Sequence, residues 1–194
     1  MTERWRLVDG ESLYDIDSDP GQKKDVAAEH PEVVARLRKA YEAWWTDVSK
    51  CFDRYSCIVL GDDAEKPTRL CSFDWHAKTA WSQGQVRSAM PVNSFWAVEI
   101  PSDGKYAFTL RRWPEEANTA INEAVPRGKA IRADTARMKI GHVEMSEKIP
   151  ADAKGVTLTA DLKAGQTTLQ TWLANSATGK SWGAYYVDVK RLGE

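Results

Sequence analysis

Residues 106–113 read Tyr-Ala-Phe-Thr-Leu-Arg-Arg-Trp, and this stretch decides the class of fold. Large apolar side chains stand at positions 106, 108 and 110, with small or polar ones between them. Successive side chains of a β-strand point to opposite faces of the sheet, so a period of two indicates a strand with one buried face. The stretch therefore predicts a half-buried strand.

The same period recurs along the chain from Ser56 onward. It is clear at 156–162 and 185–190, and further strands are expected at 56–60, 69–75, 95–100, 136–143 and 168–174. Turn-forming residues separate several of these runs, at Ser102-Asp103-Gly104, Ala164-Gly165 and Thr178-Gly179. Many short strands without an intervening helical pattern predict two packed antiparallel sheets, a jelly-roll-like β-sandwich. Residues 114–130 are expected to form a long connection with one helical turn.

Residues 4–22 read RWRLVDGESLYDIDSDPGQ and predict a different local structure. Two short strands at 4–8 and 12–16 flank Asp9-Gly10, a strong hairpin dipeptide because both residues tolerate positive φ. After the turn at Asp19-Pro20-Gly21, a helix is expected from Pro31 to about Trp45. One face of this helix is apolar and comprises Val33, Val34, Leu37, Ala40, Tyr41, Trp44 and Trp45.

Two strands and one helix make a thin hydrophobic core, so this unit needs a packing partner. We expect the Trp44 and Trp45 face to be buried against the hairpin and the sandwich. The predicted class is therefore α+β followed by all-β. Residues 1–50 form the hairpin and helix, which pack on the antiparallel β-sandwich of residues 51–194.

The composition excludes several classes of partner. The chain has 27 basic and 28 acidic residues, a formal net charge of -1, which gives no electrostatic footprint for nucleic acid or an anionic membrane. Its longest apolar runs span only a few residues, too short for a transmembrane helix or a signal peptide. Three cysteines allow at most one intramolecular disulfide, so a Cys51–Cys57 bridge and three free thiols both remain open.

No motif in the sequence predicts a metal or a cofactor. The chain has no phosphate-binding glycine loop, no nucleophile elbow and no pair of zinc-spaced histidines. Asp15-x-Asp17-x-Asp19 looks like the start of a calcium loop. However, Pro20 occupies the place of the required glycine and Val26 that of the bidentate glutamate.

The N-terminal segment, from Trp5 to about Trp45, resembles the C-terminal subdomain of the type I sulfatases (arylsulfatases). In that family a strand of the form RWRLV, a turn, an ELYDI-like strand and a DPGQ turn lead into a final amphipathic helix. The rest of the chain resembles the β-rich extension of some bacterial sulfatases at Asp74-Trp75, Leu110–Pro114 and Gly183–Val187. The resemblance implies a parent protein, periplasmic or secreted, whose large catalytic domain lies N-terminal to this region.

The chemistry of that family is missing from this chain. Sulfatases cleave sulfate esters with a formylglycine made from the Cys or Ser of a C/S-x-P-x-R motif, and neither Cys51, Cys57 nor Cys71 begins one. The nearest match begins at Ser18 but has Gln22 in place of the arginine. A glutamine amide cannot replace a charged, bidentate guanidinium.

We therefore expect this chain to be a non-catalytic accessory region of an arylsulfatase-like sulfuric ester hydrolase. It would stabilise the parent and position a sulfated glycan, with the missing catalytic domain and the carbohydrate as its partners. The alternative is a free-standing carbohydrate-binding β-sandwich protein. The sequence does not decide whether Met1 is a natural start, nor in which compartment the chain itself resides.

Nine tryptophans make a carbohydrate site worth considering, because aromatic faces stack on sugar rings and neighbouring polar groups bind the hydroxyls. The candidate ligand-binding residues are Asp74, Trp75, His76, Arg111, Arg112 and Trp182. Trp75, near a strand end, and Trp182, in a loop, are expected to be exposed. Trp96, Trp113 and Trp172 stand at strand positions and are expected to fill the sandwich core.

Arg111 and Arg112 are adjacent in the sequence. On one strand Arg111 and Arg112 point to opposite faces, and the one that faces inward must be paired because a buried unpaired guanidinium is costly. An ion pair with Glu99, Asp161 or Asp188 is one expectation. The other is that one arginine meets a sulfated or uronic sugar.

Overall fold

The computed structural model describes residues 1–193 of the chain. They divide into two compact units, the first Met1–Tyr55 and the second from Ser56 onward. The first unit thus includes residues 51–55, which lie beyond the boundary expected at residue 50. Among the described residues, no helix has the length and apolar character needed to cross a bilayer.

The first unit is a β-hairpin followed by a helix. It contains β1 (Trp5–Val8), β2 (Ser12–Asp15), α1 (Pro31–Val48) and the 3-10 turn η1 (Ser49–Cys51). Asp9 and Gly10 have φ values of 52° and 74°, so the tight hairpin turn predicted from this dipeptide is confirmed. The Asp19 carboxylate accepts the backbone N–H groups of Lys23 and Lys24 at 2.6 and 2.8 Å, which closes the turn at the DPGQ segment. Five buried side chains form the core: Trp5, Leu13, Val26, Val33 and Leu37.

The helix extends beyond the hairpin that it packs on. An 18-residue helix is about 27 Å long, whereas a four-residue strand spans about 13 Å. Val33 and Leu37 are therefore buried, while Tyr41, Trp44 and Trp45 are 56%, 54% and 43% exposed. The expectation that the hairpin buries the Trp44 and Trp45 face is wrong for this reason, and packing of this unit on the sandwich stays a prediction.

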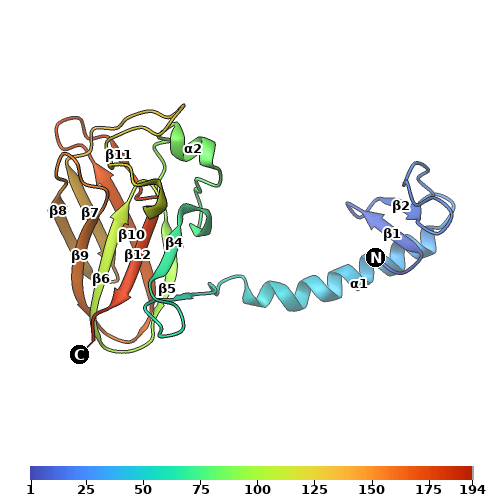
Figure 1. Cartoon of the computed structure of the whole chain (residues 1–194). Coiled ribbons are helices and arrows are strands. Elements are labelled where there is room, and N and C mark those ends of the chain that lie inside the picture. The colour runs from blue at the N-terminus through green and yellow to red at the C-terminus, as the bar shows by residue number, and fades with distance from the viewer. Residues whose placement is uncertain (194) are drawn as a thin grey trace. The chain divides into compact units, whose positions relative to one another are not determined.

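The second unit is a sandwich of two β-sheets (Figure 1). One sheet has the strand order β3-β5-β10-β7-β8, with β11 also paired to β10, and the other has the order β4-β12-β6-β9. The strand pairs of the sandwich are antiparallel except for the short parallel pair β3–β5. The predicted antiparallel β-sandwich is confirmed, and the chain passes back and forth between its sheets as in a jelly roll.

The strands of the second unit are β3 (Ile58–Val59), β4 (Thr68–Cys71), β5 (Phe95–Ile100), β6 (Gly104–Arg111), β7 (Thr135–Ile140), β8 (Val143–Lys148), β9 (Val156–Leu162), β10 (Gly165–Ala174), β11 (Ser181–Trp182) and β12 (Tyr186–Arg191). Short helices lie in the connections: η2 (Ser72–Asp74), α2 (Gln83–Arg87) and η3 (Glu115–Ala117). The helical turn expected within 114–130 is η3.

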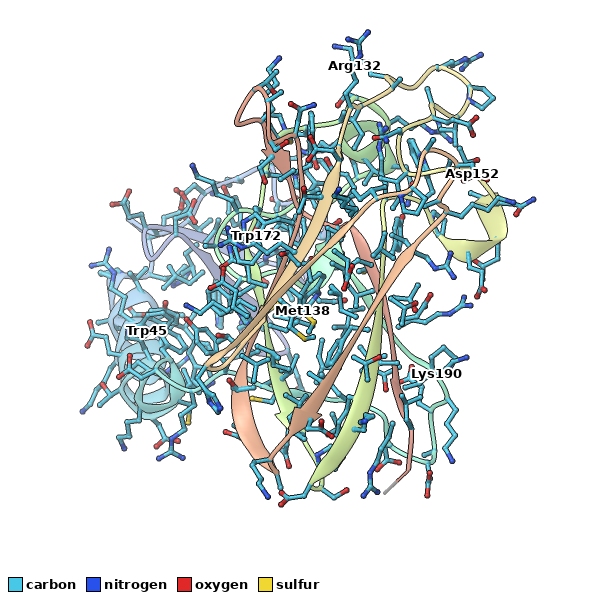
Figure 2. The ribbon with its side chains drawn as sticks, turned by 90° about the vertical axis from the view of Figure 1, so that its left-hand side faces the viewer. Trp45, Arg132, Met138, Asp152, Trp172 and Lys190 are labelled. Carbon is cyan, nitrogen blue, oxygen red and sulfur yellow. The ribbon has the colours of Figure 1, made fainter. Side chains whose placement is uncertain are left out.

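The core lies between the two sheets and follows the predicted alternation. Tyr106, Phe108 and Leu110 of β6 are fully buried, and so is Trp96 of β5. Figure 2 shows Met138 between the sheets, with Trp172 and Lys190 on opposite sides of the sandwich. The core is thus the hydrophobic interface that half-buried strands produce when two sheets pack.

Three predictions for the strands need correction. The run at 69–75 is a strand only as far as Cys71, because Ser72–Asp74 form the 3-10 turn η2. The run at 136–143 is not one strand: Gly141, with φ of 55°, turns the chain after Ile140 and β8 follows. Trp172 is only half-buried on the outer face, because Leu169, Thr171 and Leu173 take the inward positions of β10. Since Trp172 and Leu173 are both apolar neighbours, the sequence pattern alone does not say which one faces the core.

A close approach of backbone and ring provides a test of this packing. A Cβ added to Gly183 would lie 2.3 Å from Cη2 and 2.6 Å from Cζ2 of Trp75, a ring that is itself buried. Gly183→Ala is expected to lower the free energy of unfolding by about 1–3 kcal/mol through overpacking, measured by urea denaturation. Gly84→Ala in α2 is the control, because its Cβ would approach no closer than 3.7 Å and the helix gains stability. Equal effects of the two substitutions would contradict the packing argument.

Candidate functional site

The two tryptophans expected to be exposed are buried. Trp75 is 5% exposed, and its ring centroid lies 5.4 Å from that of Trp96. Trp182 is 9% exposed, and its indole N–H donates to the Ala89 carbonyl at 2.9 Å. These rings pack inside the sandwich, so they present no free face to a sugar and the expected exposure is wrong.

Arg112 is also buried, but without the carboxylate partner that the sequence led us to expect. Its guanidinium donates to the backbone carbonyls of Ile121, Glu123 and Lys129. Its Cζ lies 4.3 Å from the ring centroid of Trp113. Burial lowers the pKa of Arg112 to about 10, so the group remains charged at neutral pH. Arg112 therefore holds the 114–130 connection in place from within.

Arg111 faces the opposite way and takes one of the predicted partners. Its Nε lies 2.9 Å from Oδ2 of Asp188, so the proposed ion pair with Asp188 is confirmed. The same carboxylate lies 3.4 Å from Nε of Arg69 on β4. Arg69 also pairs with Glu115, at 3.0 Å, and with Glu116. Four elements thus meet in one network of charges on the outer face of the sheet.

A shallow cavity of about 200 Å³ lies over this network. Its walls come from β4, β6, β12 and residues 114–116, and they include Cys71 and Tyr186. Tyr186 lies opposite both Cys71 and Arg111 in the sheet register. The cavity therefore combines an aromatic side chain with charged groups that donate and accept hydrogen bonds.

The loop of residues 72–82 lies next to this cavity and carries two exposed aromatic rings. Phe73 and Trp81 are each 66% exposed. The Ser72 hydroxyl donates to the Ala80 carbonyl at 2.8 Å, which draws the two ends of the loop together. Gln83, two residues beyond Trp81, donates from Nε2 to the Tyr186 hydroxyl at 2.9 Å. We call Phe73, Trp81, Tyr186, Arg69 and Arg111 the aromatic–arginine surface.

The structure places the two remaining predicted residues, Asp74 and His76, in different surroundings. Asp74 is exposed on the same loop, and its carboxylate accepts the Cys71 S–H at 3.2 Å. His76 is half-buried and pairs with Phe95 at the other sheet, where the ring centroids lie 5.3 Å apart. Of the six predicted residues, only Asp74 and Arg111 belong to this neighbourhood.

Sequence reasoning missed Phe73, Trp81 and Arg69. Phe73 falls within the strand expected at 69–75, where the chain instead forms η2, and Trp81 stands in an irregular connection, so the local pattern marks neither ring as exposed. Arg69 lies 42 positions from Arg111 in the chain, and they come together only because β4 and β6 both pair with β12. No local signal in the sequence was available for that pairing.

Arg69 and Glu116 of the network each stabilise the ionised form of the other. A hydrogen bond from Arg69 holds the pKa of Glu116 below its usual range, and the same bond raises the pKa of the Arg69 guanidinium. Both groups are therefore ionised near neutral pH. The surface as a whole can stack on an apolar ring face, donate hydrogen bonds from guanidinium groups and accept them at carboxylates.

Comparison with known proteins gives only distant structural similarity. No protein-family profile and no curated protein matches the sequence. The chain is similar to a ruminal GH26 endo-beta-1,4-mannanase, with 11% identity and a TM-score of 0.41 over 67% of this chain and 27% of that one. It is also similar to a family 35 carbohydrate binding module from Clostridium thermocellum, with 13% identity and a TM-score of 0.36 over 64% and 98% of the two chains.

A third similar structure is a carbohydrate binding module of Cellvibrio mixtus lichenase 5A in complex with cellotriose. Identity is 13% and the TM-score 0.34, over 65% of this chain and 98% of that one. Similarity at this level assigns the chain to no family and decides no function.

The buried guanidinium gives a testable prediction. Arg112→Met is expected to lower the free energy of unfolding by about 3 kcal/mol, because buried carbonyls lose their donors. Arg111→Met on the neighbouring position is the control, and its loss is expected to stay near about 1 kcal/mol because its ion pairs are partly solvated. Urea denaturation followed by near-UV circular dichroism measures both. A loss for the Arg112 variant no larger than that of the control would show that the carbonyl contacts do not stabilise the fold.

Proposed function

We propose that the β-sandwich is a non-catalytic carbohydrate-binding unit and that it binds at the aromatic–arginine surface. The observation that carries the proposal is the pair of exposed rings, Phe73 and Trp81, on a loop whose ends adjoin the cavity: Cys71, just before the loop, lines the cavity, and Gln83, just after it, donates to Tyr186. Exposed aromatic side chains rimmed by polar groups mark binding surfaces in soluble proteins.

The chemistry of a sugar fits both parts of this surface. One face of a pyranose ring presents C–H groups, which cover an aromatic ring and remove its apolar area from water. The hydroxyl groups at the ring edge both donate and accept hydrogen bonds. Arg69 and Arg111 supply donors, and the carboxylates of Glu115 and Asp188 supply acceptors.

Substitution of the exposed rings tests the proposal. Trp81→Ala and Phe73→Ala are each expected to weaken polysaccharide binding about tenfold, since a lost aromatic contact is worth about 1 kcal/mol or more. Affinity electrophoresis through gels that contain single polysaccharides, followed by calorimetry with oligosaccharides of those retained, measures the change. Tyr186→Phe, which removes only the hydroxyl that Gln83 contacts, is expected to have a smaller effect.

Trp44→Ala is the matched control, because Trp44 is a comparably exposed tryptophan in the first unit. The proposal expects this variant to bind as the unaltered chain does. Binding that survives both loop substitutions, or a chain that binds no polysaccharide at all, would contradict the proposal.

We propose as a second function that the chain is the C-terminal accessory region of an arylsulfatase-like hydrolase. The resemblance of residues 4–22 to the sulfatase framework supports it, and so does the aromatic face of α1 that the hairpin of the same unit leaves uncovered. On that face the ring centroids of Tyr41, Trp44 and Trp45 lie 5.7–6.2 Å apart, and Phe52 packs against Trp45. An exposed cluster of this kind calls for a covering surface, which the catalytic domain of the parent would supply.

Two measurements test this second function. Sequencing of the DNA upstream of the codon for Met1 is expected to find an open frame that encodes a C/S-x-P-x-R motif, and an in-frame stop codon directly upstream would contradict it. The chain by itself is expected to hydrolyse no aryl sulfate, because no residue can become the formylglycine nucleophile. Measurable turnover of a chromogenic aryl sulfate would overturn the non-catalytic assignment.

A further inference from the structure

We infer, on the basis of the proposed glycan-binding function, that the aromatic–arginine surface selects uncharged carbohydrate and excludes sulfated and uronic sugars. The sequence led us to expect a sulfated ligand. In the structure, however, the arginines already bind carboxylates of the protein itself.

The guanidinium groups are occupied by the protein's own carboxylates. Arg69 lies within ion-pair distance of Glu115, Glu116 and Asp188 through three different nitrogens. Arg111 uses Nε for Asp188 and one terminal nitrogen for Glu115. A sulfate or a sugar carboxylate binds an arginine through the same fork of N–H groups. To bind this fork through two N–H groups at once, such a ligand would have to displace an internal carboxylate.

The balance of charge also opposes an anion. Two guanidinium groups face three carboxylates in this network, which leaves a net charge of -1. On the adjacent loop the exposed Asp74 and Lys78 offset each other. A sulfate group placed against these five ion-paired groups would thus meet a net charge of its own sign, and like charges brought together reduce affinity.

A neutral sugar has no anionic group that must displace a carboxylate or that the carboxylates would repel. Its hydroxyl groups can donate to the free lone pairs of the carboxylates and accept from the remaining guanidinium N–H groups without breaking an ion pair. Tyr186 and Trp81 offer the apolar contact. The ion pairs already orient these donors and acceptors, which reduces the ordering needed when the ligand binds.

Matched pairs of polysaccharides test the inference on the full chain. Agarose with carrageenan, and dextran with dextran sulfate, each compare a neutral polymer with a sulfated one of the same type. In affinity electrophoresis at about 0.15 M salt, where long-range charge effects are screened, the neutral member of a retained pair is expected to bind at least about tenfold tighter.

A charge variant sharpens the test. The double substitution Glu115→Gln and Glu116→Gln changes the network from -1 to +1 and frees donors on Arg69, so binding of the sulfated polymers is expected to rise about tenfold. The double substitution Glu65→Gln and Glu147→Gln alters two exposed carboxylates elsewhere by the same net charge and is expected to leave that binding unchanged. Thermal unfolding of each variant establishes that it is folded.

The outcomes separate the inference from the proposed function. Tighter binding of the sulfated member by the unaltered chain would overturn the selectivity while leaving glycan binding in place, and so would equal responses of the two double variants. Failure of the chain to retain any neutral or sulfated polymer would overturn both.

Discussion

The pleat of the chain at the end of β6 places Arg111, the last residue of the strand, and Arg112, the next residue, on opposite sides of one sheet, and much of the second unit depends on this separation. Arg112 goes inward and is surrounded by the carbonyls of Ile121, Glu123 and Lys129. Arg111 goes outward and joins Asp188. A buried guanidinium is costly unless acceptors surround it, and the connection that follows the strand supplies carbonyls to Nη1 and Nη2 of Arg112. That connection carries Glu115 and Glu116 to the outer face, where they meet Arg69 and complete the charged network.

The packing of Trp75 decides which aromatic rings of its loop are exposed to solvent. Trp75 occupies the space that a side chain at position 183 would need, and it packs against Trp96 and Tyr185. With Trp75 directed inward, the short loop that contains it leaves Phe73 and Trp81 outside. The exposed rings and the buried one thus arise from the same fold of the loop.

The first unit shows how element length limits burial. Asp9-Gly10 predicts its hairpin and Pro31 predicts the start of its helix, and the structure contains both. The periodicity of the helix also identified its apolar face, but periodicity does not say how much of that face a neighbour covers. The four-residue strands reach only the first half of the 18-residue helix, so the aromatic second half remains exposed.

The sequence by itself determined the local structure: the hairpin, the helix, most strands of the sandwich and the opposed directions of Arg111 and Arg112. These features depend on backbone geometry and on the spacing of apolar residues, which are properties of short segments. Only the tertiary structure decided the site. Trp75 and Trp182 are buried in the core, whereas Trp172 is half-buried on the outer face. Packing volume and strand register decide which of several nearby apolar residues faces the core. Arg69 reached Arg111 because β12 pairs with both β4 and β6, a contact between distant segments that no local pattern encodes.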